Sequence, residues 1–193
     1  GNDAANAVED AGNNVENALD GTENNRVNDT NNNTTTTKKT TTTTKKPADL
    51  SSIDAPAGSP VKQHGQLSVK GANIVDQNGK VFQILGMSTH GIMWEDFSDI
   101  LTYDSLKVLR DDWGINTIRI AMYTEEWGGY TTGADFAKQA KEKVNNGVKN
   151  ASDLGLYVII DWHILHDNDP LKHKSEAVAF FKEMSAKYKD YPS

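Results

Sequence analysis

The sequence predicts an α/β fold with a parallel β-sheet, confined to the part of the chain after about residue 63. Apolar strand patterns alternate three times with amphipathic helix patterns in that part, which is typical of successive βα units. The strand patterns lack polar alternation, so we expect both faces of the sheet to be covered. All tryptophan, tyrosine and phenylalanine residues also lie after about residue 65, so only this part can bury a core.

The first 62 residues are expected to be a disordered N-terminal region and linker. Residues 1–26 are rich in Ala, Asn, Asp and Glu, and a short docking helix is the alternative to disorder there. Residues 28–60 form a low-complexity Thr/Asn/Lys tract that ends in a Pro/Ser/Ala stretch, which cannot offset its ordering entropy by burial. Such a tract is typical of an extended linker to a tethered module, or of a tail without one.

The strands follow from short apolar runs between turn signals. Residues 65–80 contain two short strand-like pieces, with a turn at residues 77–79. Residues 81–87 predict the first buried strand, residues 117–123 (TIRIAMY) the second and residues 157–163 (YVIIDWH) the third. A helix pattern follows each buried strand, so a doubly wound sheet and a TIM barrel are both compatible with the order of elements.

Three helices alternate with these strands. Their patterns cover residues 102–113, 134–154 and 174–189, and glycines 114 and 155 end the first two. Each pattern carries an apolar stripe on one face. The residues expected to face inward are Leu106, Leu109 and Trp113 in the first helix, Phe136, Ala140, Val144, Val148 and Ala151 in the second, and Ala177, Phe181, Met184 and Tyr188 in the third.

The composition excludes several classes of function. The chain has no cysteine, which excludes a disulfide scaffold and a Cys-based zinc or thiol site. Its formal net charge of −7 argues against nucleic acid and anionic membranes as partners, and no run of about 18 apolar residues predicts a membrane span. No Gly-rich phosphate loop follows a strand, so nucleotide binding is not expected and no cofactor is implied.

Polar residues share one face of the second and third predicted strands. Side chains alternate along a strand, so Arg119 and Tyr123 share one face of the second strand. Asp161 and His163 likewise share one face of the third. Charged side chains inside a barrel are costly unless they pair or serve a site, and active sites in that fold lie at the C-terminal strand ends. We therefore predict a site around Arg119 and His163, with a purely structural Arg119–carboxylate pair as the alternative.

The segment after the third strand, DWHILHDND, has the composition of a metal cluster but not its spacing. His166, Asp167 and Asp169 fall in a loop with no helical or strand register that would bring them together. We therefore predict no metal site in this loop.

Aromatic residues gather in the loops after the first two buried strands. Sugar rings present apolar C–H faces that stack on aromatic planes, so such a row beside polar groups suits a polysaccharide cleft. Packing in the core is the alternative for two or three of them. The residues are Trp94, Tyr123, Trp127 and Tyr130.

Several stretches together resemble bacterial glycoside hydrolase family 5 cellulases of the cellulase A type. These stretches are GQLSVKG, ILGMSTHGIMW, SLKVLRDDWGINTIRIAMYT, LGLYVIIDWHIL and AVAFFKEMSAKY, and they cover the folded part of the chain in the family's order. The resemblance implies a (β/α)8 TIM barrel and a secreted, retaining endo-β-1,4-glucanase whose partner is a β-1,4-glucan polysaccharide. A β-mannanase or xyloglucanase of the same fold and a non-catalytic glucan-binding remnant are the alternatives.

The resemblance also implies roles for individual residues. His90 and Trp94 are similar to substrate-binding residues, Tyr123 to an aromatic residue that lines the cleft, Arg119 to the arginine that holds the nucleophilic carboxylate, and His163 to a histidine that hydrogen-bonds near the scissile sugar. Arg119 and His163 are thus expected to support the active site. The segment around Glu125, Glu126 and Trp127 departs from the family's pattern, so it takes no role from the resemblance.

Both catalytic glutamates of the family are expected beyond Ser193. The general acid belongs to an Asn-Glu-Pro motif that ends strand four, and the nucleophile ends strand seven. Residues 63–193 are therefore expected to supply only the first three βα units of the barrel, preceded by the disordered linker. Because retaining hydrolysis needs both carboxyl groups, the 193-residue chain alone is expected to be inactive.

Overall fold

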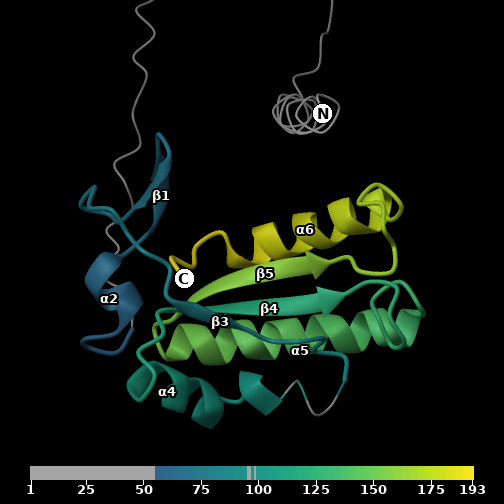
Figure 1. Ribbon diagram of the computed structural model, residues 1–193, viewed down its shortest axis with the longest axis horizontal. Coiled ribbons are helices and arrows are strands. Elements are labelled where there is room, and N and C mark those ends of the chain that lie inside the picture. The colour runs from purple at the N-terminus through teal and green to yellow at the C-terminus, as the bar shows by residue number, and fades with distance from the viewer. Residues whose placement is uncertain (1–54, 95–96, 98) are drawn as a thin grey trace, which may run out of the picture. The chain divides into compact units, whose positions relative to one another are not determined.

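The structure is a computed structural model that describes residues 55–94, 97 and 99–193. The disorder, the docking helix and most of the linker that the sequence predicts fall on residues 1–54, which lie outside the described residues. The described residues form a small N-terminal hairpin region and a three-stranded sheet with helices (Figure 1).

Residues 55–62, which the sequence analysis assigned to the linker, pack against the folded part. Helix α2 (Pro60–His64) begins after Ser59, whose side chain accepts a hydrogen bond from the backbone N–H of Lys62. Proline suits the first turn of a helix because its missing N–H would have no partner there. The packed chain therefore begins before the predicted boundary. The apolar cluster that holds it consists of Ala55, Val61, Phe82 and Tyr157.

A two-stranded antiparallel hairpin precedes the main sheet. Strand β1 (Ser68–Lys70) pairs with β2 (Asn73–Val75), as the two short strand-like pieces predict. The predicted turn at residues 77–79 is closed by buried Asp76, whose carboxylate accepts the backbone N–H of Asn78 at 2.9 Å and of Lys80 at 3.0 Å. These backbone hydrogen bonds, that from Lys80 first, lower the pKa of Asp76.

The main sheet has three parallel strands in the order β3-β4-β5. They are β3 (Gly86–Ser88), β4 (Thr117–Tyr123) and β5 (Tyr157–His163), and the last two have the predicted bounds. The first strand is shorter than predicted. The side-chain amide of Asn116 donates to the carbonyl of Gln83 and accepts from the backbone N–H of Leu85. These two hydrogen bonds take the place of backbone pairing between strands at these residues. Leu85 is consequently half exposed rather than buried.

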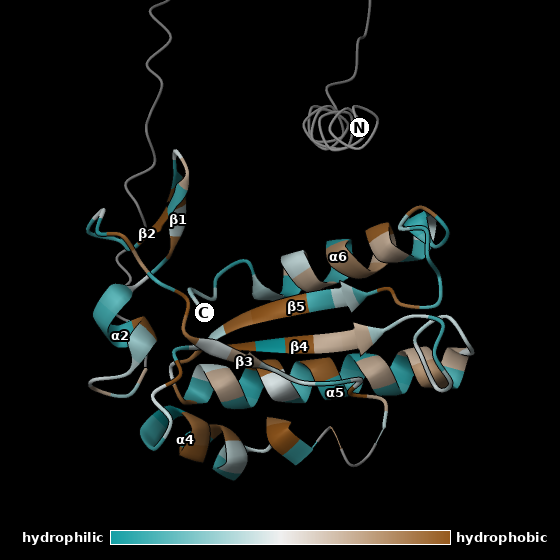
Figure 2. Cartoon of the chain, viewed as in Figure 1, coloured by the Kyte–Doolittle hydropathy of each residue, from teal (hydrophilic) through white to brown (hydrophobic). Residues whose placement is uncertain are grey.

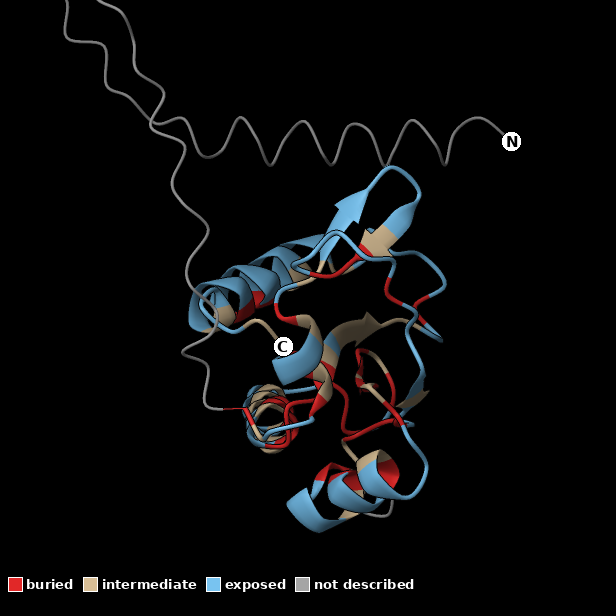
Figure 3. Cartoon of the chain, turned by 90° about the vertical axis from the view of Figure 1, so that its left-hand side faces the viewer, coloured by how far each residue is buried: buried red, intermediate tan, exposed pale blue. Residues whose placement is uncertain are grey.

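The helices pack on one face of this sheet. Alternate residues of β4 turn their apolar side chains into a core that also receives residues from each helix, as the strand pattern predicts. Figure 3 shows the buried positions gathered in the interior, with exposed positions on the outer sides of the helices. Among the described helices, none is both long and apolar enough to cross a membrane. The helices are η2 (Asp99–Leu101), α4 (Tyr103–Asp111), α5 (Ala134–Asp153) and α6 (Lys174–Tyr188).

Two residues predicted to face inward do not. Trp113 is 68% exposed, because α4 ends at Asp111 and the chain turns away before Gly114. In α6 the buried aromatic residue is Phe180 and not Phe181, since Phe180 contacts the ring of Trp162 on β5. Figure 2 shows hydrophobic colour in the first half of β5 and along most of β4, a hydrophilic segment in each of these strands, and mixed colour in the helices.

Candidate active site

Three strand ends bring polar side chains to one edge of the sheet. Because β3, β4 and β5 are parallel, Ser88, Tyr123 and His163 end their strands on the same side. Active sites of α/β barrels form at this edge. His90 follows β3 directly and reaches the hydroxyl of Tyr123, with Nε2 at 3.5 Å from Oη.

An ion-paired cluster links the three strands on the face opposite the helices. Arg119 in β4 donates from Nη2 to Oδ2 of Asp161 in β5 at 2.6 Å, and from Nη1 to Oγ of Ser88 in β3 at 2.8 Å. These two bonds fix the plane of the guanidinium group, and the bond to the carboxylate is charge-assisted. The side chain of Arg119 is 36% exposed, so part of the guanidinium still faces the open side of the sheet.

His163 completes this cluster through one of its ring nitrogens, and no hydrogen bond joins the other nitrogen to a described residue. Its Nδ1 lies 2.9 Å from Oδ2 of Asp161 and 2.9 Å from Nη2 of Arg119. A guanidinium nitrogen only donates, so one tautomer cannot satisfy both contacts. Nδ1 can either donate to the carboxylate of Asp161 or accept from Arg119. We assign the Nδ1 proton to the bond with Asp161, which is the acceptor of the two partners. The Nε2 atom of His163 then remains available as an acceptor.

A row of four rings leads away from this cluster, and we call it the ring row. The ring of Tyr123 stacks on His163 with centroids 4.4 Å apart, and His90 lies 5.4 Å from Tyr123. Trp94 stacks on His90 at 5.4 Å and also meets the ring of Tyr123 edge-on at 5.6 Å. Tyr123 is buried and forms the floor of the row, and burial is the main cause of its raised pKa. The ring row thus offers aromatic surface that begins at the charged cluster.

The structure brings all five predicted site residues into one connected group. The prediction that Arg119 and His163 share a surface with His90 nearby follows from strand parity, and the contacts above agree with it. Ser88 was not predicted, because one serine at a strand end carries no pattern of its own. Its contact with Arg119 follows only from the pairing of β3 with β4.

Two carboxylates in the loop after β4 hold the loop after β5. Glu126 is buried and accepts from the backbone N–H of His166 at 3.1 Å, and its Oε2 lies 2.5 Å from Nδ1 of the same residue. Glu125 lies 2.6 Å from Nζ of Lys172 and 2.6 Å from Nε2 of His173. The hydrogen bond from Lys172, followed by that from His173, lowers the pKa of Glu125. Both carboxylates are therefore engaged in holding loops.

One group of side chains near these loops could hold a metal ion. Glu125, Asp167 and His173 each offer one ligand atom, and these atoms lie within 4.8 Å of one another. Asp167 is buried, with Oδ2 bonded to Thr124 and Oδ1 without a partner among the described residues. The ammonium of Lys172 already forms an ion pair with the carboxylate of Glu125. The spacing within the loop after β5 does not indicate this group, because Glu125 comes from the preceding βα unit and His173 lies beside the start of α6.

The comparison with known families follows this geometry. The family model described as cellulase (glycosyl hydrolase family 5) matches residues 75–193, which include the charged cluster and the ring row. The chain belongs to glycosyl hydrolase family 5. The resemblance that the sequence motifs carry is thereby confirmed, and the family's solved structures imply a (β/α)8 TIM barrel.

Similar proteins include curated endoglucanases and solved cellulase structures. This family 5 chain is 51% identical over 143 residues to endoglucanase A of Evansella cellulosilytica, which is 74% of this chain and 28% of that protein. It matches the structure of cellulase Cel5C_n with a TM-score of 0.67 and 43% identity, over 72% of this chain and 43% of that one. It also matches the catalytic domain of Thermobifida fusca endoglucanase Cel5A in complex with cellotetraose, with a TM-score of 0.59 and 37% identity, over 70% and 42% of the chains.

The chain is short beside these proteins. It spans between 27% and 30% of the lengths of the curated endoglucanases from Pectobacterium, Clostridium, Butyrivibrio and Evansella.

Proposed function

We propose that this chain is the substrate-binding first part of an endo-β-1,4-glucanase that cleaves β-1,4-glucan with retention of configuration. One observation carries the proposal. In a family 5 chain, the ring row, whose aromatic faces can stack on pyranose rings, meets the charged cluster of Arg119, Asp161 and His163. Aromatic planes bind the C–H faces of sugars, and the charged cluster supplies polar groups at the end of the row. The relative from Thermobifida fusca was solved with cellotetraose, a substrate of this chemical class.

The described residues are proposed to supply the first three βα units of the barrel. In support, the chain after α6 returns to the outer edge of β5, where the backbone N–H of Val158 donates to the carbonyl of Ser193 at 2.8 Å. A next parallel strand would pair along this edge. Ile159 lies on the face of β5 opposite the helices and is 41% exposed, and strands that close the barrel would cover it.

The two catalytic carboxyl groups are proposed to come from other strands of the barrel. Retaining hydrolysis needs an acid/base and a nucleophile about 5 Å apart. Among the described carboxylates at this edge, Asp161 is bound by Arg119, and Glu125 and Glu126 hold loops. The contacts with Asp161 and Ser88 use only part of the N–H donors of Arg119, so the remainder are proposed to orient the nucleophile.

His163 and the ring row are proposed to position the sugar. The free Nε2 of His163 can accept from a sugar hydroxyl, while His90, Trp94 and Tyr123 carry the chain of glucosyl units away from the charged cluster. We also propose that the protein acts outside the cell, because a polymeric glucan cannot enter it. Residues 28–60 have the composition of a linker to a tethered module.

The test measures reducing sugar released by the complete protein that contains this chain. Carboxymethylcellulose, galactomannan and xyloglucan are compared as substrates, and we expect clear preference for the first. The substitutions Arg119→Ala and His163→Ala should each lower kcat/KM at least about 100-fold, in line with the loss of positioned groups in other active sites. Asp190→Asn, an exposed residue outside the cluster, is the matched control. Wild-type activity in the Arg119 and His163 variants would remove the cluster from the active site.

A further inference from the structure

We propose that a cavity beyond Trp94 is an additional binding site for a glucosyl unit, and that Trp127 is the residue that sets its strength. The site would take a distal sugar of the same glucan chain and would make the enzyme prefer long chains. This inference rests on the proposed function, and it centres on Trp127, to which the family resemblance assigns no role.

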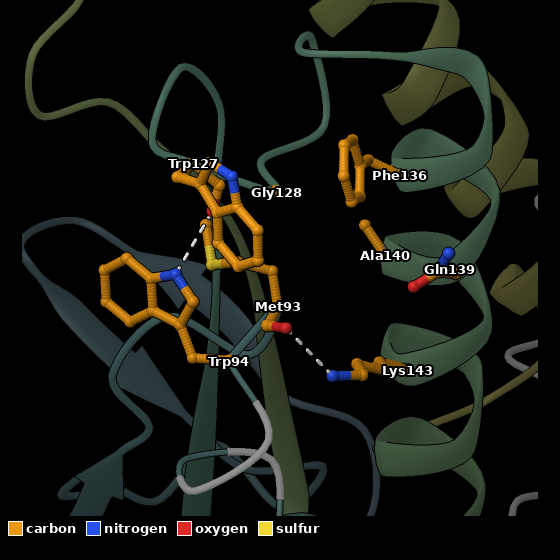
Figure 4. A pocket seen from close by; sticks show the side chains of 8 residues that line it. All are labelled: Met93, Trp94, Trp127, Gly128, Phe136, Gln139, Ala140 and Lys143. Carbon is orange, nitrogen blue, oxygen red and sulfur yellow. Dashed lines mark hydrogen bonds between the residues drawn. The ribbon is translucent and has the colours of Figure 1, made fainter.

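The cavity lies between the loop after β3, the loop after β4 and helix α5. Its volume is about 430 Å³, within the range of about 300–1,000 Å³ that is usual for small-molecule sites. Figure 4 shows Trp127 and Met93 on one side and the side chains of α5 on the other. The lining residues are Met93, Trp94, Trp127, Gly128, Phe136, Gln139, Ala140 and Lys143.

The cavity continues the ring row. Trp94, the last ring of the row, also lines the cavity, and its indole Nε1 donates to the backbone carbonyl of Trp127 at 3.1 Å. Trp94 is linked to His163 through Tyr123, whose ring lies 5.6 Å from that of Trp94, so at least one ring separates the cavity beside Trp94 from the charged cluster. A glucan chain bound along the row would therefore bring its next unit to the cavity. This continuity selects a sugar of the same chain as the occupant.

Trp127 presents a large apolar surface to solvent. The residue is 79% exposed, and its ring lies 6.2 Å from that of Phe136, which faces it from α5 on the opposite side of the cavity. An exposed indole beside a cavity leaves an aromatic face open to a ligand. Nothing in the described core requires the ring to lie there.

The loop that carries Trp127 is held firmly in place. Glu126, the buried residue before Trp127, is bonded to His166. The N–H of Gly129, two residues after Trp127, donates to the carbonyl of Glu126 at 2.6 Å. A Cβ atom on Gly129 would lie 2.4 Å from the carbonyl oxygen of Thr124, so only glycine permits this close approach. A platform fixed before binding loses little entropy when it binds a sugar.

The opposite side of the cavity supplies polar groups. Lys143 donates to the carbonyl of Met93 at 3.2 Å, and its ammonium has further N–H donors. Gln139 is exposed on the same face of α5 and offers both an amide donor and an acceptor. A pyranose needs an apolar surface for its C–H face and donors and acceptors for its hydroxyls, and the cavity combines both.

The test compares oligosaccharides of different length on the complete protein. Initial rates are measured with cellotriose to cellohexaose for the wild type, Trp127→Ala, Trp127→Phe and Trp113→Ala. Trp113 is a matched control because it is also an exposed tryptophan, at 68%, and does not line the cavity. We expect Trp127→Ala to raise KM for cellohexaose about 10-fold with kcat unchanged, which corresponds to about 1.4 kcal/mol. Activity on the shortest cleaved oligosaccharide should stay within about two-fold, and Trp127→Phe should recover most of the loss.

The outcomes separate this inference from the proposed function. A wild-type protein that cleaves no cello-oligosaccharide contradicts the proposed function itself. A cleaving wild type whose Trp127→Ala variant shows unchanged kinetics on every substrate contradicts only the additional site. An equal loss on short and long substrates also contradicts it, because Trp127 would then act on the fold of the loop rather than on a distal sugar.

Discussion

Arg119, Asp161 and His163 show how far single residues can be assigned from a sequence. Their shared face follows from the two-residue period of strands, which is why Arg119 and His163 could be predicted to lie together. The contact of Arg119 with Ser88, and the contacts of the loop carboxylates with the loop after β5, could not be predicted, because they join segments more than 30 residues apart and depend on how the strands pair. For single residues, the sequence therefore predicts which side chains share one face of a strand. It does not predict which residues of different βα units contact each other.

Glu125 provides a pH test at the residue scale. Hydrogen bonds from Lys172 and His173 lower its pKa below the ordinary value of 4.5. A group with a lowered folded-state pKa stabilises the fold above the unfolded pKa, and this contribution is lost as the pH falls through the lower folded value. We expect Glu125→Gln to reduce Tm at pH 6, and we expect this difference to shrink as the pH falls through the folded-state pKa.

The measurement is thermal unfolding of the complete protein at several pH values. Glu142→Gln serves as a control, because it removes an exposed carboxylate on α5. A Tm difference between Glu125→Gln and wild type that stays constant from pH 6 to pH 3 would show that the charge of Glu125 is not responsible.

Strands β4 and β5 show what the sequence predicts well at the scale of elements. Both are seven-residue apolar runs between turn signals, and the structure gives them the predicted bounds. The phase of α6 was wrong because Phe180 and Phe181 are adjacent aromatic residues, and only the contact of Phe180 with Trp162 decides between them. The start of the packed chain was also predicted too late. Ser59 followed by Pro60 is a typical helix start. It did not predict a helix here because it lies within a stretch that has the composition of a linker.

Gly147 tests the packing of α5 on the sheet. A glycine inside a helix costs about 1 kcal/mol relative to alanine, so its presence needs a reason. A Cβ atom there would lie 2.9 Å from Cδ1 of Ile120 and 3.0 Å from Cδ1 of Leu101, both of which are flexible side-chain ends. We therefore expect Gly147→Ala to change the free energy of unfolding by less than about 1 kcal/mol, because helix propensity offsets the crowding. Gly147→Leu should destabilise by about 2 kcal/mol or more.

Chemical denaturation of the complete protein measures both variants of Gly147. An exposed position of α5 gives the control: Lys138→Leu adds a leucine without crowding the sheet and should be near neutral. If Gly147→Leu is as stable as wild type, the close approach of α5 to β4 is not a feature of the folded protein.

At the scale of the whole molecule, the described sheet leaves open the outer edge of β5 and the face opposite the helices. Among the described residues, the carbonyl of Ser193 accepts from Val158 at the outer edge of β5, and the apolar residues Ile84 and Ile159 are 42% and 41% exposed. Unpaired edges and open apolar faces favour association with other chains. These features agree with the proposal that further strands complete a barrel. The sequence motifs indicated the family, whereas the open side of the sheet became visible only with the strands in place.

The central claim is that these residues bind and orient a glucan, while the reacting carboxyl groups come from the rest of a family 5 barrel. The most direct test compares release of reducing sugar from carboxymethylcellulose by the 193-residue chain alone and by a barrel that joins residues 55–193 to the remaining part of endoglucanase A of Evansella cellulosilytica, which is 51% identical over the matched part. We predict turnover by the joined barrel and none by the chain alone, with contaminating cellulase excluded by the Arg119→Ala and His163→Ala variants. Turnover by the isolated chain, or a folded joined barrel without activity, would contradict the claim.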